Sequence, residues 1–539
     1  MDSNIGFIVA KHLAMAAQSR PEALAVVDPS GIQWTYRRFQ DESERTAAIL
    51  HAAGIERGMR CVVMVPPGLP FFSLTFALFQ LAAVPVLIDP GMGIRGLGRC
   101  IADAEPTAFI GVRKAHWARR LLGWGRRTVR IAIAVGKHGV IAPRSDSGVT
   151  RLTPAWDVES SETAAILFTS GSTGPAKGAV YTHGMFSAQV EALRQLFDIR
   201  PGEIDLCTFP LFALFAPALG MTAIIPRMDA TRPAQVSPSA IFRPIEGWRA
   251  TNLFGSPALL NTISRTAERQ RVTLPTLRRV VSAGAPVPAA VIERVTRMLA
   301  PGVRVYTPYG ATECLPVSCI DSATILGETR KQTERGAGIC VGRPVPEVDV
   351  AVIPVSDEAI LEWRDDLRLP ADVVGEIAVQ GPFVSPAYFN RPDATRLAKI
   401  AGQDGTIWHR MGDLGYLDES GRLWFCGRKA HRVWTETGPL DTIPCEAVFN
   451  THPAVFRSAL VGVGSRGRQT PVLCVELEPA ARKIGRADLT QQLLDLGSRF
   501  AHTSGIRTIL FHRGFPVDVR HNAKIDREVL ARWAARRLQ

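Results

Sequence analysis

An apolar run followed by glycines, hydroxyls and one lysine is the strongest chemical signal in this sequence. The run AAILFT (164–169) leads into a polar turn whose notable members are Thr169, Ser170, Gly171, Ser172, Thr173, Gly174 and Lys177. Glycines let the backbone approach a ligand closely, and successive N–H groups form a concavity that binds anions. The segment differs from a Walker A loop, which ends in Gly-Lys-Ser/Thr and opens a helix. It predicts a cradle for a polyphosphate.

Four further charged residues stand in motifs that carry the family resemblance described below. They are Glu313 in YTPYGATE (306–313), Asp413 in HRMGDLGY (409–416), Arg428 at the end of GRLWFCGR (421–428) and Lys524 in RHNAKIDR (520–527). Magnesium prefers oxygen ligands such as a carboxylate, and cations balance a phosphate chain where charge is rearranged. Taken singly, Asp413 could be a turn residue and Lys524 a solvated charge.

The elements around these residues alternate between strands and helices. ALAVV (23–27), AAILFT (164–169) and RRVVSAG (278–284) are typical of buried strands, and PAAVIERVTRMLA (288–300) is typical of a helix. The uncharged stretch 61–88 is long enough for a membrane span, but prolines interrupt it and it divides into strand, helix and strand. The pattern predicts an α/β protein with parallel sheets.

The texture of the sequence changes near residue 428. The segment 446–465 reads as a helix followed by a strand, and an apolar strand and a second helix follow before a basic end. We expect a large N-terminal domain of layered sheets and helices at 1–428 and a small α+β domain at 429–539, hinged near residue 428. The small domain would carry Lys524.

The composition is that of a globular protein with a basic surplus. The chain has 63 Lys and Arg against 50 Asp and Glu, a formal net charge of +13. This surplus could serve nucleic acid, an anionic membrane surface, an acidic partner or a polyanionic substrate such as ATP. No zinc-finger spacing supports nucleic acid. The nine cysteines form no C-x-x-C pair, which is typical of reduced thiols in a cytoplasmic protein.

Part of the surplus lies in a basic segment at 113–130, which also contains Trp117, Leu121, Leu122 and Trp124. One interpretation is a solvated helix face followed by a strand. The other is a docking surface for an acidic protein or a membrane.

Taken together and in order, the motifs resemble the acyl-adenylate-forming superfamily, which includes acyl-CoA synthetases, nonribosomal peptide adenylation domains and luciferases. The resemblance covers essentially the whole chain. It also includes WTYRRF (34–39), LAAVPVLIDP (81–90), SAGAPV (282–287) and GEIAVQGPFVSPAYFN (375–390). It implies an enzyme that uses ATP and Mg²⁺ to convert a carboxylate into an acyl-adenylate in a cleft between a large and a small domain.

The resemblance also implies a role for each candidate residue. Residues 169–174 and Lys177 would form the phosphate cradle, and Gly284, Ala285 and Pro286 the turn beside adenine. Tyr309, Gly310 and Ala311 would form the motif that stacks on adenine. Thr312 and Glu313 would contact the α-phosphate and Mg²⁺, and Asp413 and Arg428 would hold the ribose. Lys524 would reach across the domain gap to the carboxylate and the α-phosphate. Thr312, Glu313, Lys177 and Lys524 form the expected catalytic set.

An apolar segment falls where the superfamily lines its acyl pocket. FPLFALFAPALGM (209–221) contributes Phe209, Phe212 and Phe215, and NLFGSPALL (252–260) contributes Phe254 and Gly255. A pocket segment with no charge to pair an amino group favours a fatty or alkyl acid over an amino acid. Ordinary core packing is the alternative for any single phenylalanine.

Two departures from the superfamily pattern bear on the fate of the adenylate. Ala430 stands where Asp or Lys commonly forms the domain pivot, and the loop 438–446 is one residue longer than usual. Both put transfer to CoA in doubt. The stretches 226–238, 254–260 and 515–527 resemble one branch, the β-lactone synthetases of bacterial long-chain olefin biosynthesis.

That branch implies adenylation of a 2-alkyl-3-hydroxy fatty acid, whose own hydroxyl then displaces AMP to close a β-lactone. It also implies companion enzymes in one assembly, with 113–130 as a candidate surface. His183 is a candidate for the base that takes the hydroxyl proton. A long-chain fatty acyl-CoA synthetase remains the alternative enzyme, and a catalytically dead scaffold of a multienzyme complex the alternative from another class.

Overall fold

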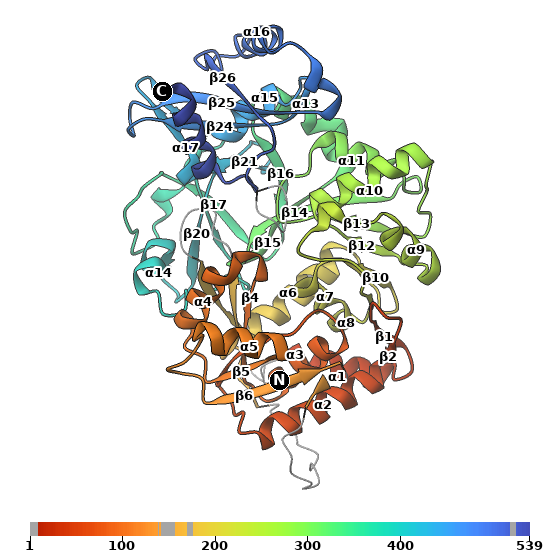
Figure 1. Ribbon diagram of the computed structural model, residues 1–539. Coiled ribbons are helices and arrows are strands. Elements are labelled where there is room, and N and C mark those ends of the chain that lie inside the picture. Colours follow the sequence, from red (N-terminus) through yellow and green to blue (C-terminus); the bar gives the residue numbers. More distant parts are fainter. Residues whose placement is uncertain (1–8, 138, 142–156, 170–175, 518–523) are drawn as a thin grey trace.

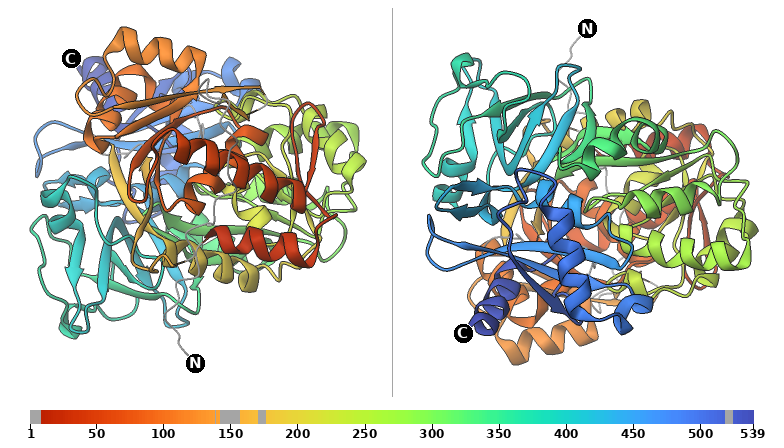
Figure 2. Two further views of the ribbon diagram at one scale, coloured as in Figure 1. Left: turned by 90° about the horizontal axis from the view of Figure 1, so that it is seen from below. Right: turned by 90° about the horizontal axis from the view of Figure 1, so that it is seen from above.

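The computed structural model describes residues 9–137, 139–141, 157–169, 176–517 and 524–539 (Figure 1). Its strands form two large sheets and two small ones, with helices packed on them, which confirms the predicted α/β class. The small sheets (blue in Figure 1) lie at one end of the molecule, above β21 (Leu423–Arg428) and β16 (Ile339–Pro344). Figure 2 shows the same arrangement from below and above.

A seven-stranded sheet contains the two strands that flank the predicted polyphosphate segment. Its strands, in spatial order, are β7 (Gly139–Val140), β6 (Ile131–Gly136), β5 (Ala108–Val112), β3 (Arg60–Met64), β4 (Val84–Ile88), β8 (Thr163–Thr169) and β9 (Lys177–Thr182). All neighbours pair in parallel except at the two edges, where β7 and β9 are antiparallel. Apolar strands buried on both faces are expected of such a sheet.

The uncharged stretch 61–88 folds as its sequence predicts. It forms β3, the buried helix α3 (Leu69–Gln80) and β4, with β3 and β4 paired in parallel. Helices α2 (Tyr36–Ala52), α4 (Gly93–Ala104) and α5 (Arg113–Leu122) belong to the same region. Within the described part of the chain, no helix combines the length and the apolar character that a membrane crossing requires.

A fourteen-stranded sheet forms the second large layer. In spatial order it runs β17 (Asp349–Ile353), β18 (Gly375–Gln380), β20 (Ile407–Leu417), β21, β16, β15 (Cys314–Asp321), β14 (Arg304–Ala311), β13 (Arg279–Val281), β12 (Asn252–Phe254), β10 (Ile204–Cys207), β11 (Thr222–Ile224), β1 (Leu24–Val27) and β2 (Gln33–Thr35), with β19 (Lys399–Ala401) on β20. The stretch from β14 to β1 is parallel, and the stretch from β17 to β15 is antiparallel.

The remaining helices of this part of the chain are α1 (Val9–Ser19), α6 (His183–Leu196), α7 (Pro210–Ala213), α8 (Phe215–Ala218), α9 (Ser239–Trp248), α10 (Pro257–Gln270), α11 (Ala289–Thr296), α12 (Ser322–Thr324), α13 (Arg330–Glu334) and α14 (Pro392–Ala398). The parallel strands are short and apolar, and the helices between them are amphipathic. This is the alternation that the sequence shows.

After Arg428 the chain builds separate, smaller sheets. The strands are β22 (Val433–Thr435), β23 (Gly438–Leu440), β24 (Val455–Val463), β25 (Thr470–Leu477) and β26 (Thr508–His512), and the helices are α15 (Thr442–Phe449), α16 (Arg486–Gly497) and α17 (Arg527–Leu538). Phe449, Leu460, Leu473 and Leu493 are fully buried in a core of their own.

Besides the contacts of Lys429, two ion pairs between described residues join this C-terminal part to the rest of the molecule. Arg265 pairs with Glu478 at 2.8 Å, and Arg466 pairs with Asp357 at 3.0 Å. Gly336 has a φ of +92°, and a Cβ there would lie 2.1 Å from Nε2 of His502. His502 can therefore approach this position only because residue 336 is a glycine.

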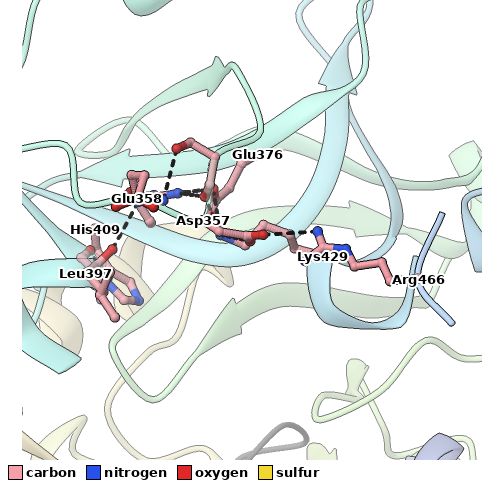
Figure 3. A network of polar contacts seen from close by, with 10 residues as sticks. Asp357, Glu358, Glu376, Leu397, His409, Lys429 and Arg466 are labelled. Carbon is pink, nitrogen blue, oxygen red and sulfur yellow. Dashed lines mark hydrogen bonds and ion pairs between the residues drawn. The ribbon is translucent and has the colours of Figure 1, made fainter. Parts of the chain in front are cut away.

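Lys429 ties the first residue after β21 into a polar network of the large sheet (Figure 3). Its Nζ donates to the carbonyl of Ser356 at 2.8 Å and to Glu376 at 3.2 Å. Arg410 donates to the same Glu376 carboxylate at 2.6 Å, and both of these side chains are 2% exposed. Asp357, which pairs with Arg466, lies 3.9 Å from Lys429.

Candidate active site

Asp413 is held by two donors from neighbouring strands. Asp413 in β20 lies opposite Arg428 in β21, and the guanidinium donates to its Oδ1 at 2.7 Å. The hydroxyl of Tyr309, from β14, donates to Oδ2 at 2.6 Å. The Asp413 residue is 4% exposed, and the pair raises the pKa of Arg428. A buried carboxylate persists when it is paired and hydrogen-bonded, so this one is fixed in position as an acceptor.

The turn that carries Thr312 and Glu313 joins β14 to β15. The hydroxyl of Tyr388 donates to Oε1 of Glu313 at 2.6 Å, and the N–H of Ser385 donates to the carbonyl of Glu313 at 2.7 Å. The hydroxyl of Tyr181 donates to the carbonyl of Thr312. Burial and the adjacent Glu313 carboxylate raise the pKa of Tyr388, which therefore remains a donor at neutral pH.

Two lysines approach the ring of Tyr388. Nζ of Lys177, at the start of β9, lies 4.9 Å from the ring centroid, and Nζ of Lys399 lies 5.9 Å from it. The Lys399 ammonium is buried with no hydrogen-bond partner among the described residues. Burial lowers its pKa from 10.5 to about 8, although the Glu313 carboxylate acts in the opposite direction. Two positive charges, those of Lys177 and Lys399, therefore lie around the tyrosine that is hydrogen-bonded to Glu313.

His409 is the cross-strand partner of Lys399. The two residues are paired between β19 and β20, and His409 is 2% exposed, with Nδ1 3.2 Å from the carbonyl of Ala398. Burial and the neighbouring cation place the pKa of His409 well below its ordinary value, so the imidazole is neutral. Sequence analysis did not single out Tyr388, Lys399 or His409. The sequence signal that could have indicated Lys399 is a lysine at the start of the short apolar strand KIA, β19.

The described residues fit a metal ion only in company with a phosphate chain. They contain no cluster of three or more His, Cys, Asp or Glu side chains that could hold a metal by themselves. Glu313 is a single carboxylate beside Lys399, and Lys177 contacts the ring of Tyr388, whose hydroxyl donates to Glu313. Magnesium is commonly held by one or two carboxylates together with phosphate and water oxygens, and this donor set fits that mode. Residues 170–174 of the predicted cradle lie outside the described part.

The other predicted nucleotide residues lie near these groups in the fold. Gly284 has a φ of +96° and, with Ala285 and Pro286, lies a few residues after the end of β13. Because β13 runs parallel to β14, this turn leaves the sheet at the edge toward which Tyr309, Gly310 and Ala311 extend. Ligands of open α/β sheets bind outside the carboxyl ends of the strands.

A cavity of about 90 Å³ lies between the parallel strands β10, β12, β13 and β14 and the helices α6 and α8. Phe212, Phe215 and Phe254 line it, and the rings of Phe212 and Phe254 are 4.7 Å apart. Phe209 packs against both Phe212 and Phe254, at 5.1 and 6.2 Å. Gly255 donates its N–H to Val281 at 2.9 Å, and a Cβ there would meet Leu259 at 3.0 Å.

One end of the cavity corrects the expectation of a pocket without charge. Asp205, Asn252 and Arg279 are aligned across three parallel strands, and all three line the cavity. Arg279 forms a buried ion pair with Glu203, and burial raises the pKa of Asp205 to about 6. The apolar segment 209–221 therefore covers one wall only, and the floor comes from strands that are far apart in sequence.

Two further candidates lie outside these groups. His183 begins α6 and is fully buried; burial lowers its pKa to about 4, and it is not among the cavity residues. This position does not support its suggested role as the base for ring closure. Lys524 is exposed, two residues before Asp526, whose side chain accepts from Val529 at the start of α17.

A sheet edge that combines a fixed acceptor, a carboxylate among lysines and an apolar cavity is typical of a nucleotide-dependent enzyme acting on an apolar substrate. Residues 13–389 match the family of AMP-binding enzymes, and the chain belongs to that family.

The chain is similar over nearly its whole length to two curated proteins named olefin beta-lactone synthetase. It is 47% identical to that of Xanthomonas campestris pv. campestris, over 98% of this chain and 97% of the relative, and 44% identical to that of Stenotrophomonas maltophilia, over 98% of each. A long-chain-fatty-acid–CoA ligase of Mycobacterium tuberculosis is 26% identical over 85% of this chain and 83% of the relative.

The fold agrees with solved enzymes. The amide bond synthetase McbA of Marinactinospora thermotolerans superposes with a TM-score of 0.79 at 24% identity, over 97% of this chain and 99% of that one.

Proposed function

We propose that this enzyme adenylates a 2-alkyl-3-hydroxy fatty acid with ATP and Mg²⁺ and then closes it to a β-lactone, releasing pyrophosphate and AMP, in long-chain olefin biosynthesis. The end-to-end similarity to two olefin beta-lactone synthetases is the observation that carries this proposal. The cavity supports it, because its lining is mainly apolar and therefore suits an alkyl chain.

In the first step, a carboxylate oxygen of the substrate attacks the α-phosphorus and the bond to pyrophosphate breaks. Asp413 would accept hydrogen bonds from the ribose hydroxyls, held in place by Tyr309 and Arg428. The ring of Tyr309 would stack on adenine beside residues 284–286. Fixing the nucleotide in this way contributes through orientation rather than through bond chemistry.

The cations of the site would offset the phosphate charge. Lys177 and residues 169–174 would hold the β- and γ-phosphates. Mg²⁺ held by Glu313 would neutralise charge on the phosphate oxygens, and Thr312 would contact the α-phosphate. Lys524 would act on the carboxylate and the α-phosphate from a separate unit, 429–539, that moves relative to 1–428. Such charges matter most where they meet charge that develops in the transition state.

In the second step, the 3-hydroxyl oxygen attacks the activated carbonyl carbon. A carbon–oxygen bond forms, the bond from carbon to the AMP oxygen breaks, and the hydroxyl proton passes to a base. The nucleophile is already tethered, and a well-oriented tethered group can reach effective molarities of about 10⁵ M, which four-ring strain reduces here. Ala430 and the lengthened loop 438–446 agree with a reaction in which no thiol acceptor enters.

Product analysis tests the proposal. A 2-alkyl-3-hydroxy acid with ATP and Mg²⁺ should yield the β-lactone, AMP and pyrophosphate without CoA, as seen by mass spectrometry and NMR. The matched acid without the 3-hydroxyl should stop at the adenylate. Accumulation of an acyl-CoA, with turnover that requires CoA, would instead identify a long-chain fatty acyl-CoA synthetase, the alternative that the 26% relative represents.

A catalytically dead scaffold is the weaker alternative, because Lys177, Glu313, Asp413 and Lys524 are all present. We expect companion enzymes that supply the hydroxy acid and consume the lactone in one assembly. A cytoplasmic location is consistent with nine free cysteines.

A further inference from the structure

The outer face of α5 combines cationic and apolar side chains at helical spacing. Trp117 is 73% exposed and Leu121 is 86% exposed. Arg113, Lys114 and Arg120 are exposed at the positions four before, three before and three after Trp117, which are its neighbours on a helix surface. The face is therefore mixed rather than simply solvated.

The opposite face of α5 packs on the seven-stranded sheet. Ala115 is buried, Nε2 of His116 lies 2.9 Å from the carbonyl of Ile133, and the guanidinium of Arg119 lies 5.5 Å from the ring of Phe109. These contacts fix which side chains point outward. Trp117 and Leu121 are thus left in solvent by the packing of the helix itself.

The surrounding sequence carries positive charge only. Residues 106–145 contain nine Lys or Arg and no Asp or Glu. Across the described residues, the ion pairs do not include Arg113, Lys114, Arg120, Arg126 or Arg127. Within the described part of the chain, no ion pair neutralises the charge of these five side chains.

Helix α4 extends the same surface. A Cβ at Gly98 of α4 would lie 2.8 Å from Nε1 of Trp124, so the side chain of Trp124, which follows α5, packs against α4. Ile94 of α4 is 62% exposed, and Arg95 and Arg99 are exposed beside it. Both helices (orange in Figure 2) lie at the periphery of the molecule in both views.

We propose that the outer faces of α4 and α5 dock this enzyme on an anionic lipid surface. Exposed apolar side chains such as Trp117 and Leu121 can insert into a lipid headgroup layer without a complementary groove. A folded protein partner would have to provide such a groove. Each Lys or Arg near an anionic membrane adds attraction to it. Because residues 106–145 contain no Asp or Glu, no carboxylate of this segment offsets that attraction. On the proposed function, a lipid interface is also where the long-chain substrate gathers.

Flotation with vesicles tests the docking surface. The full-length enzyme is mixed with vesicles of phosphatidylcholine alone or with phosphatidylglycerol, at low and high salt. We expect binding to the phosphatidylglycerol vesicles that weakens with salt. Trp117→Ala with Leu121→Ala should lower partitioning about tenfold or more. Arg113→Gln with Arg120→Gln should lower it about tenfold and reduce the salt dependence.

Leu361→Ala is the matched control, because Leu361 is also strongly exposed, at 64%, but lies in another part of the chain. It should partition as the wild type does. Pyrophosphate release with a short, water-soluble acid should be unchanged in all variants, which separates docking from catalysis. Absence of wild-type binding, or equal binding by the α5 variants and the wild type, would overturn the proposal and leave an acidic protein as the occupant.

Discussion

Lys399 is a cation buried beside Glu313 without a hydrogen-bond partner among the described residues, and such burial costs stability. Its pKa is about 8 in the folded protein against an ordinary 10.5. The folded state therefore binds fewer protons between these values, and stability should rise with pH across that window. Below pH 8 the cost is fully present, about 3 kcal/mol from the size of the shift.

Lys399→Met should therefore raise the free energy of unfolding at pH 7 by up to about 3 kcal/mol, with a gain that shrinks as the pH approaches 10.5. Thermal or denaturant unfolding of both proteins across this range measures it. A loss of stability, or a gain that does not change with pH, would show that the ammonium is paired.

Glu313→Gln keeps the shape of the side chain and its bond from Tyr388 but removes one charge. If Glu313 holds Mg²⁺, the variant should need more magnesium for half-maximal pyrophosphate release and should be about a hundredfold slower. Magnesium titration of pyrophosphate release checks this. Unchanged magnesium dependence would remove Glu313 from the ligand set.

Lys524→Ala should abolish adenylate formation, by about 10²–10³-fold or more, while ATP binding and thermal stability stay close to wild type. The residue is exposed, so its loss leaves no cavity. Single-turnover adenylate formation and calorimetric ATP binding separate the two effects. Pyrophosphate release at the wild-type rate would rule out the role.

Among the packed elements, the apolar cavity depends on the contact between Phe212 and Phe254. Phe254→Trp should fill part of the cavity and shift the preference toward shorter alkyl chains, at a cost in stability of about 1–3 kcal/mol from overpacking. The measurement is kcat/KM for a chain-length series. Phe456→Trp is the control, because Phe456 is 36% exposed in the C-terminal part. An unchanged chain-length profile in Phe254→Trp would separate the cavity from the substrate.

Elements with local patterns could be predicted from the sequence, whereas long-range pairing could not. The β-α-β unit at 61–88 has one apolar pattern for each element, and its helix is buried all round as that pattern requires. The cavity floor was missed because Asp205, Asn252 and Arg279 meet only through the register of three strands. Lys399 and His409 face each other for the same reason. Tyr388 lay in a recognised motif, but its bond to Glu313 joins distant segments.

At the scale of the molecule, Gly336 lets the C-terminal part approach. Gly336→Ala should displace that part from the rest of the chain and slow adenylate formation, because a Cβ would meet His502 at 2.1 Å. Small-angle scattering and pyrophosphate release measure the two effects.

Gly302→Ala is the matched control: its φ is +86°, similar to that of Gly336, but nothing lies within 4 Å of its Cβ position. Both variants carry the backbone strain of a side chain at positive φ. Equal behaviour of the two would mean that the contact with His502 has no bearing on the arrangement of the domains.

The polar network around Lys429 has a consequence for the design of chimeric enzymes. Arg428 and Lys429 are both anchored to the large sheet, through Asp413 and through Glu376 with the carbonyl of Ser356. A C-terminal part transplanted from a relative should therefore be joined after Lys429, so that the host keeps its own ammonium on a carboxylate that is 2% exposed. A junction before Lys429 would replace the ammonium that pairs with the buried Glu376 carboxylate by a residue of the relative. Grafts joined before Lys429 should therefore give less folded protein than grafts joined after it.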